Sequence, residues 1–316
     1  MNICVVGAGA IGGWIAARLA LAGNELSVIA RDETLNAIET QGLHITDGGD
    51  TRCVAVATAS DPAGLGFQDM IVLAVKAPAL PGIAGSFESL IGPETRIVPM
   101  LNGVPWWFTD DPLWSVDPDA GIRDALPAEK VVGCVVHASC FRTAPNHVTV
   151  KHAEKLILGE PDGGAGERIE GLCSLFESAG IRCQASDNVR RAIWYKLWGN
   201  ATINPLSALT RSTADQLLTQ PTVRAFMADA MDELAAVGAA IDCPISESAE
   251  DRMAVTARLG AFKSSMLQDV EAGRTIELEA LLGAPREIAR RVGIATPQLD
   301  RIYAMTRLMA ENLGLL

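Results

Sequence analysis

The chain has 316 residues, of which 49% are hydrophobic and 20% charged, and it carries a formal net charge of −12. This size and composition indicate a globular protein with room for two domains and exclude a disordered chain. The negative charge argues against nucleic acid and anionic membrane surfaces as partners, and no apolar run approaches the roughly 20 residues that a membrane helix needs.

The first predicted element is an apolar strand that breaks into a G-x-G-x-x-G turn within the first twelve residues. In a strand–turn–helix unit, Gly7 allows the tight turn, Gly9 leaves room for a pyrophosphate and Gly12 lets the helix pack closely on the strand. An amphipathic helix over 11–21 and a second strand over 25–30 supply that context, so we predict dinucleotide binding rather than a plain strand–helix turn. The phosphate-binding residues would be Gly7, Ala8, Gly9, Ala10, Ile11 and Gly12.

The residues after the second strand select the dinucleotide. Enzymes that use NAD place Asp or Glu here, where it accepts hydrogen bonds from the ribose 2′-hydroxyl. This chain has Ala30 and Arg31 instead, and a guanidinium suits a 2′-phosphate. Asp32 is the competing candidate, and Arg31 could also be a solvated loop residue. The interpretation we favour is NADPH.

Strand-like and helix-like segments alternate through the first 100 residues, which is typical of a parallel sheet with crossover helices. Residues 131–160 indicate short antiparallel strands, and a helix over 166–178 with a strand over 181–185 completes this half. We predict an α/β domain with a mainly parallel sheet over 1–187 and an all-α domain over 188–316. The expected strands are 2–6, 25–30, 51–58, 70–75, 95–101, 131–137, 146–151 and 155–159, and the expected helices of the second half are 189–204, 221–240, 247–272, 275–292 and 297–313.

An aromatic-rich segment over 104–128 contains Trp106, Trp107, Phe108 and Trp114, with Asp and Pro residues between them. This composition indicates a loop. The interpretation we favour is a loop pinned down by its aromatic side chains, and the alternative is a lid over a cleft.

Seven cysteines are scattered without a C-x-x-C pair, mostly in apolar strand-like runs. This pattern indicates reduced, buried thiols in a cytoplasmic protein. We expect no signal peptide, because the first strand begins at residue 2. The four histidines lack a zinc-type spacing, so we expect no metal. The sequence is compatible with assembly into a homodimer.

A polar stripe lies in a second informative segment, where Lys196, Asn200 and Asn204 are spaced i, i+4, i+8 on a helix that is otherwise nearly all apolar. Such a helix is buried, so its stripe must face paired groups or a water-filled cleft. A lysine there suits a general acid. Partial desolvation lowers the pKa of the amine, while a nearby carboxylate would keep the proton on the amine. In a carbonyl reduction it would protonate the developing alkoxide. A solvent-facing lysine is the alternative.

Together these motifs resemble the ketopantoate reductase family over essentially the whole chain. The resemblance rests on G-A-G-A-I-G, V-K-A around Lys76, L-N-G around Asn102, K-L-W-G-N-x-x-x-N-P-L-S-A-L from Lys196, and S-S-M-L-Q-D-V with a late Glu. It implies a Rossmann-type domain paired with a helical substrate domain. The implied activity is NADPH-dependent reduction of 2-dehydropantoate, a small 2-keto acid, to (R)-pantoate in pantothenate biosynthesis.

The resemblance also implies roles for single residues. Composition alone would not single out Ser265 or Glu277, so their roles rest on the resemblance. Lys196 would be the catalytic proton donor, and Glu277 would contact the cofactor and matter for turnover. The implied substrate contacts are Asn102, Lys196, Asn200, Asn204 and Ser265, and the implied cofactor contacts beyond the glycine turn are Arg31, Lys76, Asn102, Ala138 and Glu277.

Three positions depart from the family pattern. Ala214 and Phe262 stand where the best-known members have asparagine, and Leu282-Gly283 stands where they have N-G. These changes make part of the expected substrate site less polar, so another branched or more apolar 2-keto acid is an alternative substrate. A non-catalytic NADPH-binding protein is a third hypothesis, and the intact spacing from Lys196 to Asn204 argues against it.

Overall fold

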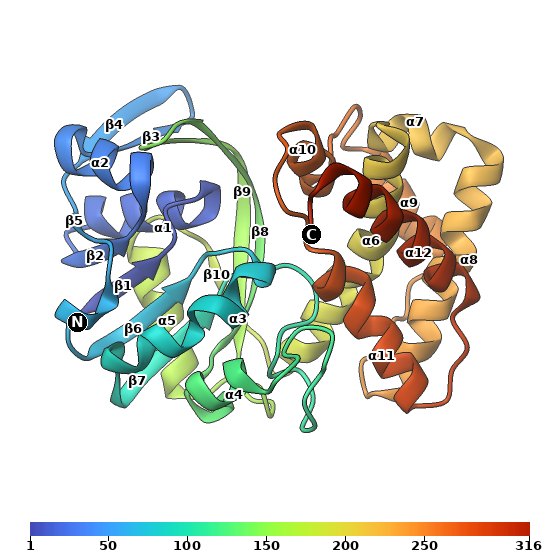
Figure 1. The fold of residues 1–316 in the computed structure, drawn as a ribbon, viewed down its shortest axis with the longest axis horizontal. Helices are drawn as coiled ribbons and strands as arrows, with labels where there is room; N and C mark the ends of the chain where they lie inside the picture. Colours follow the sequence, from blue (N-terminus) through green and yellow to red (C-terminus); the bar gives the residue numbers. More distant parts are fainter. The chain divides into compact units, whose positions relative to one another are not determined.

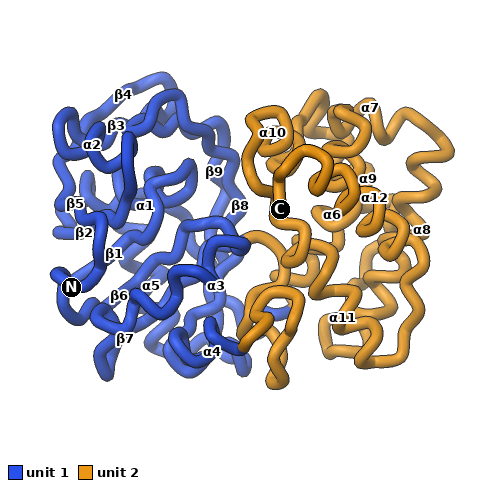
Figure 2. Tube along the Cα trace, in the orientation of Figure 1, with its two compact units in different colours: residues 1–101, 120–190 blue, residues 102–119, 191–316 orange.

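The computed structural model describes all 316 residues, and they form two compact units (Figure 2). Unit 1 contains Met1–Leu101 and Ala120–Arg190, and unit 2 contains Asn102–Asp119 and Arg191–Leu316. The segment 102–119 therefore belongs with the helical half, although in sequence it lies between the two parts of unit 1. No helix is both long and apolar enough to span a membrane.

A five-stranded parallel sheet organises the first part of unit 1 (Figure 1). Its strand order is β5-β2-β1-β6-β7, and every pairing within it is parallel. This confirms the predicted α/β class, and the absence of any strand after β10 confirms the all-α second half. The strands are β1 Ile3–Val6, β2 Leu26–Ile29, β5 Ala57–Ala59, β6 Gln68–Leu73 and β7 Ile91–Pro99.

A second sheet of unit 1 has the order β10-β9-β3-β4, with β8 paired antiparallel to β9. The three short strands expected between 131 and 159 are in fact one long hairpin, whose β-bulges interrupt the alternation that the sequence analysis used. The strands are β3 Leu43–Asp47, β4 Asp50–Val54, β8 Gly133–Ala144, β9 His147–Gly159 and β10 Cys183–Ala185.

The expected single strand over 51–58 was wrong, because its two halves join different sheets. Strand β4 pairs with β3 in the second sheet, whereas β5 pairs with β2 in the first. The prediction missed β3, although the two-residue turn that joins it to β4 is a hairpin signal. That turn consists of Gly48 and Gly49, both with positive φ.

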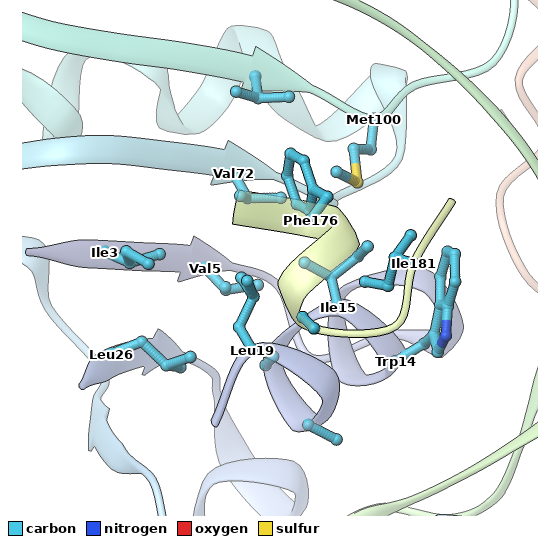
Figure 3. Close-up of a cluster of buried hydrophobic side chains, with 14 of the residues drawn as sticks. Ile3, Val5, Trp14, Ile15, Leu19, Leu26, Val72, Met100, Phe176 and Ile181 are labelled. Carbon is cyan, nitrogen blue, oxygen red and sulfur yellow. The ribbon is translucent and has the colours of Figure 1, made fainter. Parts of the chain in front are cut away.

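The core of unit 1 joins the parallel sheet to helices on its face (Figure 3). Helix α1, over Ala10–Leu21, buries Trp14, Ile15 and Leu19 completely or nearly so. The remaining helices of unit 1 are α2 Asp32–Gln41, α3 Leu80–Ile83, α4 Gly121–Ala125 and α5 Glu167–Ser178, with 3-10 turns at Pro62–Gly64, Ala77–Ala79, Ala84–Leu90 and Ala128–Lys130.

The regular elements of unit 2 are all helices, as expected, but several of them differ from the predicted ones. The first helix continues past Pro205 to Thr210, and α7 was missed. The segment 247–272 holds two helices rather than one, because Gly260 has a φ of +62° and Ser264 caps a new helix by accepting from the Leu267 amide. The helices are α6 Val189–Thr210, α7 Ala214–Thr219, α8 Pro221–Ala240, α9 Ala249–Ala257, α10 Ser265–Glu271, α11 Ala284–Arg291 and α12 Pro297–Leu313.

The favoured interpretation of the aromatic segment is confirmed for residues 104–119 but not for the whole of 104–128. Trp114 is 58% exposed and does not pin the loop, and residues 121–125 form helix α4 of unit 1. Trp106, Trp107 and Phe108 are buried, and the Phe108 ring stacks on Trp194 of α6 at a centroid distance of 5.9 Å. Farther along the loop, Glu287 of α11 accepts hydrogen bonds from backbone amides at 3.1 and 2.9 Å and from the Ser115 hydroxyl at 2.6 Å. Rings and hydrogen bonds together fix this segment to the helices of its own unit.

Candidate active site

The glycine-rich turn of unit 1 has the geometry that its sequence predicts. Gly7 has a φ of +95°, a conformation that favours glycine. A Cβ on Gly12 would lie 1.9 Å from the Gly7 carbonyl oxygen, so only hydrogen fits where α1 meets the strand end. At Gly9, by contrast, the nearest atom to an added Cβ is the Ala74 carbonyl oxygen at 3.9 Å. The turn is closed on its helix side and open at Gly9.

These features fit a dinucleotide phosphate. Gly9 is the N-cap of α1, and no acidic residue lies in the first helical turn. The first amides of a helix have no partner within it and carry partial positive charge, so they suit an anion. The residues predicted from Gly7 to Gly12 thus form a cradle that a pyrophosphate can approach.

The other cofactor candidates of unit 1 lie on separate elements. Strand β2 ends at Ile29, before Arg31 and Asp32. Both are exposed, Arg31 as the N-cap of α2 and Asp32 with a φ of +48°. Lys76 is half-buried after β6, and Ala138 lies at a β-bulge in β8. Their roles remain predictions.

Helix α6 supplies Lys196 from a buried framework. Two tryptophans on either side of it anchor α6 to α8: the indole N–H of Trp194 donates to the Leu234 carbonyl at 3.0 Å, and that of Trp198 donates to Met231 at 2.8 Å. Lys196 itself is only partly exposed. The expectation of a largely buried helix with a polar stripe is therefore confirmed.

Lys196, Asn102 and Glu277 form a continuous hydrogen-bonded chain. The Lys196 ammonium donates to Asn102 Oδ1 at 2.9 Å, and Asn102 Nδ2 donates to Glu277 Oε2 at 3.1 Å. An ammonium can only donate and a carboxylate can only accept, so the two neighbours fix the orientation of the amide. Glu277 is 8% exposed, and the asparagine connects this buried carboxylate to the amine.

The backbone next to Asn102 is held by an irregular helix. The predicted helix over 275–292 begins instead with a π-helical turn, Glu279–Gly283. There the Ala284 amide donates to the Glu279 carbonyl. The same pattern would pair the Ala280 carbonyl with residue 285, which is a proline and has no N–H.

The Ala280 carbonyl accepts a hydrogen bond from outside the helix. The Val104 amide donates to it at 2.8 Å. Gly103 lies between this bond and Asn102, with a φ of +79°, and a Cβ there would lie 2.3 Å from the Ala280 oxygen. The π-helical turn therefore fixes the backbone that carries Asn102.

The remaining predicted substrate residues differ in exposure. Asn200 is partly exposed, and Asn204 is buried with 4% of its surface exposed. Ser265 is exposed as the first residue of α10, whereas its neighbour Ser264 is buried and caps that helix. Their roles in holding a substrate remain predictions.

The two less polar departures lie together. The Ala214 amide donates to the Phe262 carbonyl at 2.9 Å, which joins the start of α7 to the segment before α10. Ala214 is buried, and Phe262 is partly exposed. Their proximity makes them one local change rather than two separate ones.

Sequence reasoning missed the residues that position the site. The residues that do this are Gly103, Ala280 and Pro285. Only Gly103 and Pro285 could have been recognised in the sequence. A proline inside an expected helix indicates a break, and a glycine after Asn102 allows a positive φ. Nothing in the sequence singles out Ala280, because its contribution is a backbone carbonyl.

Comparison with known proteins gives a consistent result. The sequence matches the family described as "Ketopantoate reductase PanE/ApbA" over residues 3–163 and its C-terminal family over residues 188–310. A 2-dehydropantoate 2-reductase of Mesorhizobium japonicum is 36% identical over 323 residues, covering 99% of both chains.

Solved structures agree with these matches. A candidate ketopantoate reductase from Ralstonia solanacearum is 46% identical with a TM-score of 0.97, covering 100% of this chain and 99% of that one. The 2-dehydropantoate 2-reductase of Methylococcus capsulatus is 30% identical with a TM-score of 0.86, covering 99% of this chain and 98% of that one.

Proposed function

Since the chain belongs to the ketopantoate reductase family, we propose that it reduces 2-dehydropantoate to (R)-pantoate with NADPH, on the route to pantothenate. The observation that carries the proposal is the hydrogen-bonded chain from Lys196 through Asn102 to Glu277. It provides a proton donor with a fixed position, because the Glu277 carboxylate orients the amide that holds the amine.

Each of the three hydrogen-bonded residues has a distinct task. Lys196 donates a proton from Nζ to the substrate oxygen as negative charge develops there. Asn102 directs Nζ by accepting one of its hydrogens, and Glu277 keeps the amide of Asn102 in the orientation that permits this. We further propose that Asn200, Asn204 and Ser265 orient the keto acid.

The cofactor assignment rests on unit 1. When bound, NADPH supplies the hydride that reduces the ketone carbon. The turn from Gly7 to Gly12 would hold its pyrophosphate, and Arg31 and Lys76 would face the adenosine side, with Arg31 on the 2′-phosphate. Ala138, Asn102 and Glu277 are proposed as further contacts. We propose 1–187 as the cofactor domain and 188–316 as the substrate domain, except that the segment 102–119, which carries Asn102, packs with the helical unit.

Replacing Arg31 tests the choice of dinucleotide. In Arg31→Ala we expect the dissociation constant for NADPH to rise about tenfold while that for NADH changes little, because only NADPH has a phosphate to lose a partner. Titration of both dinucleotides by fluorescence measures this. Asp32→Ala serves as the neighbouring control. Equal losses of NADPH and NADH would refute the 2′-phosphate contact.

The apolar side chains of Ala214 and Phe262 favour a second candidate, reduction of a different branched or more apolar 2-keto acid. Steady-state NADPH oxidation with 2-dehydropantoate, 2-oxoisovalerate and phenylglyoxylate separates the two, with Lys196→Ala as the blank. The main proposal expects the highest kcat/KM for 2-dehydropantoate. A higher value for a less polar acid supports the second candidate. Tight NADPH binding without turnover of any acid would indicate a non-catalytic binding protein.

A further inference from the structure

Two thiols of unit 1, which the proposed reaction does not use, lie in contact. Cys173 is in the second half of α5, and Cys183 is the first residue of β10. The Cys183 S–H donates to Cys173 Sγ at an S–S separation of 2.9 Å. A disulfide bond is about 2.05 Å long, so the two sulfur atoms need to approach by only about 0.9 Å.

The chain between the two cysteines is fixed at both ends. Phe176 and Ile181 are buried in the core of unit 1 (Figure 3), and the Ile181 amide donates to the Phe176 carbonyl at 3.0 Å. Gly180 completes the turn with a φ of +72°. This anchored turn keeps the helix and the strand together, so the thiols cannot separate without disturbing the core.

The strand that carries Cys183 can make the small adjustment that bond formation requires. Strand β10 has three residues and lies at the edge of its sheet, where it pairs only with β9. Cys183 is also partly exposed, whereas Cys173 is buried. An edge position with partial exposure gives a small oxidant access to the pair.

We propose that Cys173 and Cys183 are an oxidative modification site, which a hydroperoxide converts into an intramolecular disulfide. The Cys173 thiolate attacks one peroxide oxygen, the O–O bond breaks, and the thiolate becomes a sulfenic acid with release of hydroxide. The Cys183 sulfur then attacks Cys173 Sγ, and the sulfenic oxygen leaves as water. Two thiols and one hydrogen peroxide thus give one disulfide and two waters.

The hydrogen bond between the thiols assigns their roles. Donation from Cys183 lowers the pKa of the Cys173 thiol, although burial and the nearby Glu177 and Glu170 act in the opposite direction. The same hydrogen bond, together with burial, raises the pKa of Cys183. The lowered pKa favours Cys173 as the attacking thiolate and leaves Cys183 as the resolving thiol.

Peptide mapping of the full chain tests the site directly. Trypsin cleaves after Arg182, so the two cysteines fall in separate peptides, 169–182 and 183–190. After brief treatment with hydrogen peroxide and alkylation of remaining thiols, we expect these two peptides to be joined, with a mass about 2 Da below their sum. Dithiothreitol should separate them. The oxidised protein should also melt several degrees higher, because the bond constrains the unfolded chain.

Serine variants complete the test. Cys173→Ser and Cys183→Ser should each abolish the joined peptide, and Cys53→Ser, at an exposed cysteine of β4, should leave it unchanged. The wild-type map decides the matter even where a variant fails to fold. Sulfinic acid on separate peptides, or a bond from either cysteine to Cys134, would overturn the proposal. None of these readouts depends on the reductase activity.

Discussion

The glycine turn of unit 1 and the hydrogen-bonded chain of unit 2 are constructed in opposite ways. The turn is made of backbone, from six consecutive residues, and its function depends on side chains being absent at Gly7 and Gly12. The chain of unit 2 is made of side chains that are far apart in sequence. Asn102 is 94 residues from Lys196 and 175 from Glu277. The first is therefore a local property of the sequence, whereas the second exists only after unit 2 has folded.

This difference determines what a substitution can do. In a turn made of backbone, an added methyl group is the damaging change, because it fills space that the chain needs. Among the hydrogen-bonded side chains of unit 2, removing one polar group abolishes the function while the fold survives. The following predictions test each side of this contrast, in order of decreasing effect.

The largest effect is expected from Lys196→Ala. We expect kcat to fall about 100-fold or more, because the proton donor is lost. NADPH affinity should stay close to that of the wild type, since the proposed phosphate contacts lie in unit 1. Steady-state assays and dinucleotide titration measure the two quantities. Lys263→Ala, which removes an exposed lysine paired with Glu271, is the matched control. Near-wild-type turnover of Lys196→Ala would disprove the mechanism.

Gly12→Ala should be next in size. Its Cβ would lie 1.9 Å from the Gly7 oxygen, so α1 or the turn must move. We expect a loss of about 2 kcal/mol in the free energy of unfolding and roughly 30-fold weaker NADPH binding. Gly13→Ala is the control, because an added Cβ there first meets Val148 at an ordinary 3.7 Å. Chemical denaturation and titration check both. Equal effects at the two glycines would contradict the importance of close packing at Gly12.

Gly103→Ala should have a smaller but specific effect. The added Cβ would displace the Ala280 carbonyl from Val104 and so misplace Asn102. Steady-state assays should show kcat falling about tenfold. Gly273→Ala has a similar positive φ of +64° but nothing within 4 Å of its Cβ, so it isolates backbone strain from the collision. If both variants lose activity alike, the π-helical turn does not position Asn102.

The smallest effect concerns pH and the aromatic loop. Burial raises the pKa of Glu287, but hydrogen bonds from Ser115 and Trp114 outweigh it and leave the pKa below the ordinary value of 4.5. A lowered folded-state pKa stabilises the protein above pH 4.5, and this stabilisation is lost as pH falls through the folded-state pKa.

Glu287→Gln tests this linkage. At pH 7 we expect the variant to be about 1 kcal/mol less stable, a difference of a few degrees in Tm. The difference should shrink as the pH is lowered below 4.5, because the wild-type carboxylate then becomes protonated. Thermal unfolding followed at several pH values measures it. A constant difference at all pH values would mean that the charge of Glu287 does not hold the loop.

The contrast between the units also explains which parts of the structure could be predicted. The strand, the glycine turn and α1 follow from spacing within the first 21 residues, because each requirement acts between neighbours. The split between β4 and β5 could not be derived in this way, since partners elsewhere in the chain decide which sheet each strand joins.

The candidate site of unit 2 shows the same limit. The stripe from Lys196 to Asn204 was visible because helical periodicity places these residues on one face. Its connection to Glu277 through Asn102 was not visible, because it depends on the π-helical turn and on a carbonyl that Pro285 leaves without a partner in the helix. The resemblance to a family named these residues, but only the structure shows how they are connected.

The membership of segment 102–119 in unit 2 has a consequence for biosynthesis. Trp106, Trp107 and Phe108 leave the ribosome long before α6, which carries the Trp194 ring that stacks on Phe108. Until residues 191–316 have been translated, three large apolar side chains of this segment lack the unit that buries them. The nascent chain thus carries an exposed hydrophobic segment, which is prone to aggregation, during most of its synthesis. A fragment that starts at residue 188 would lack part of its own core.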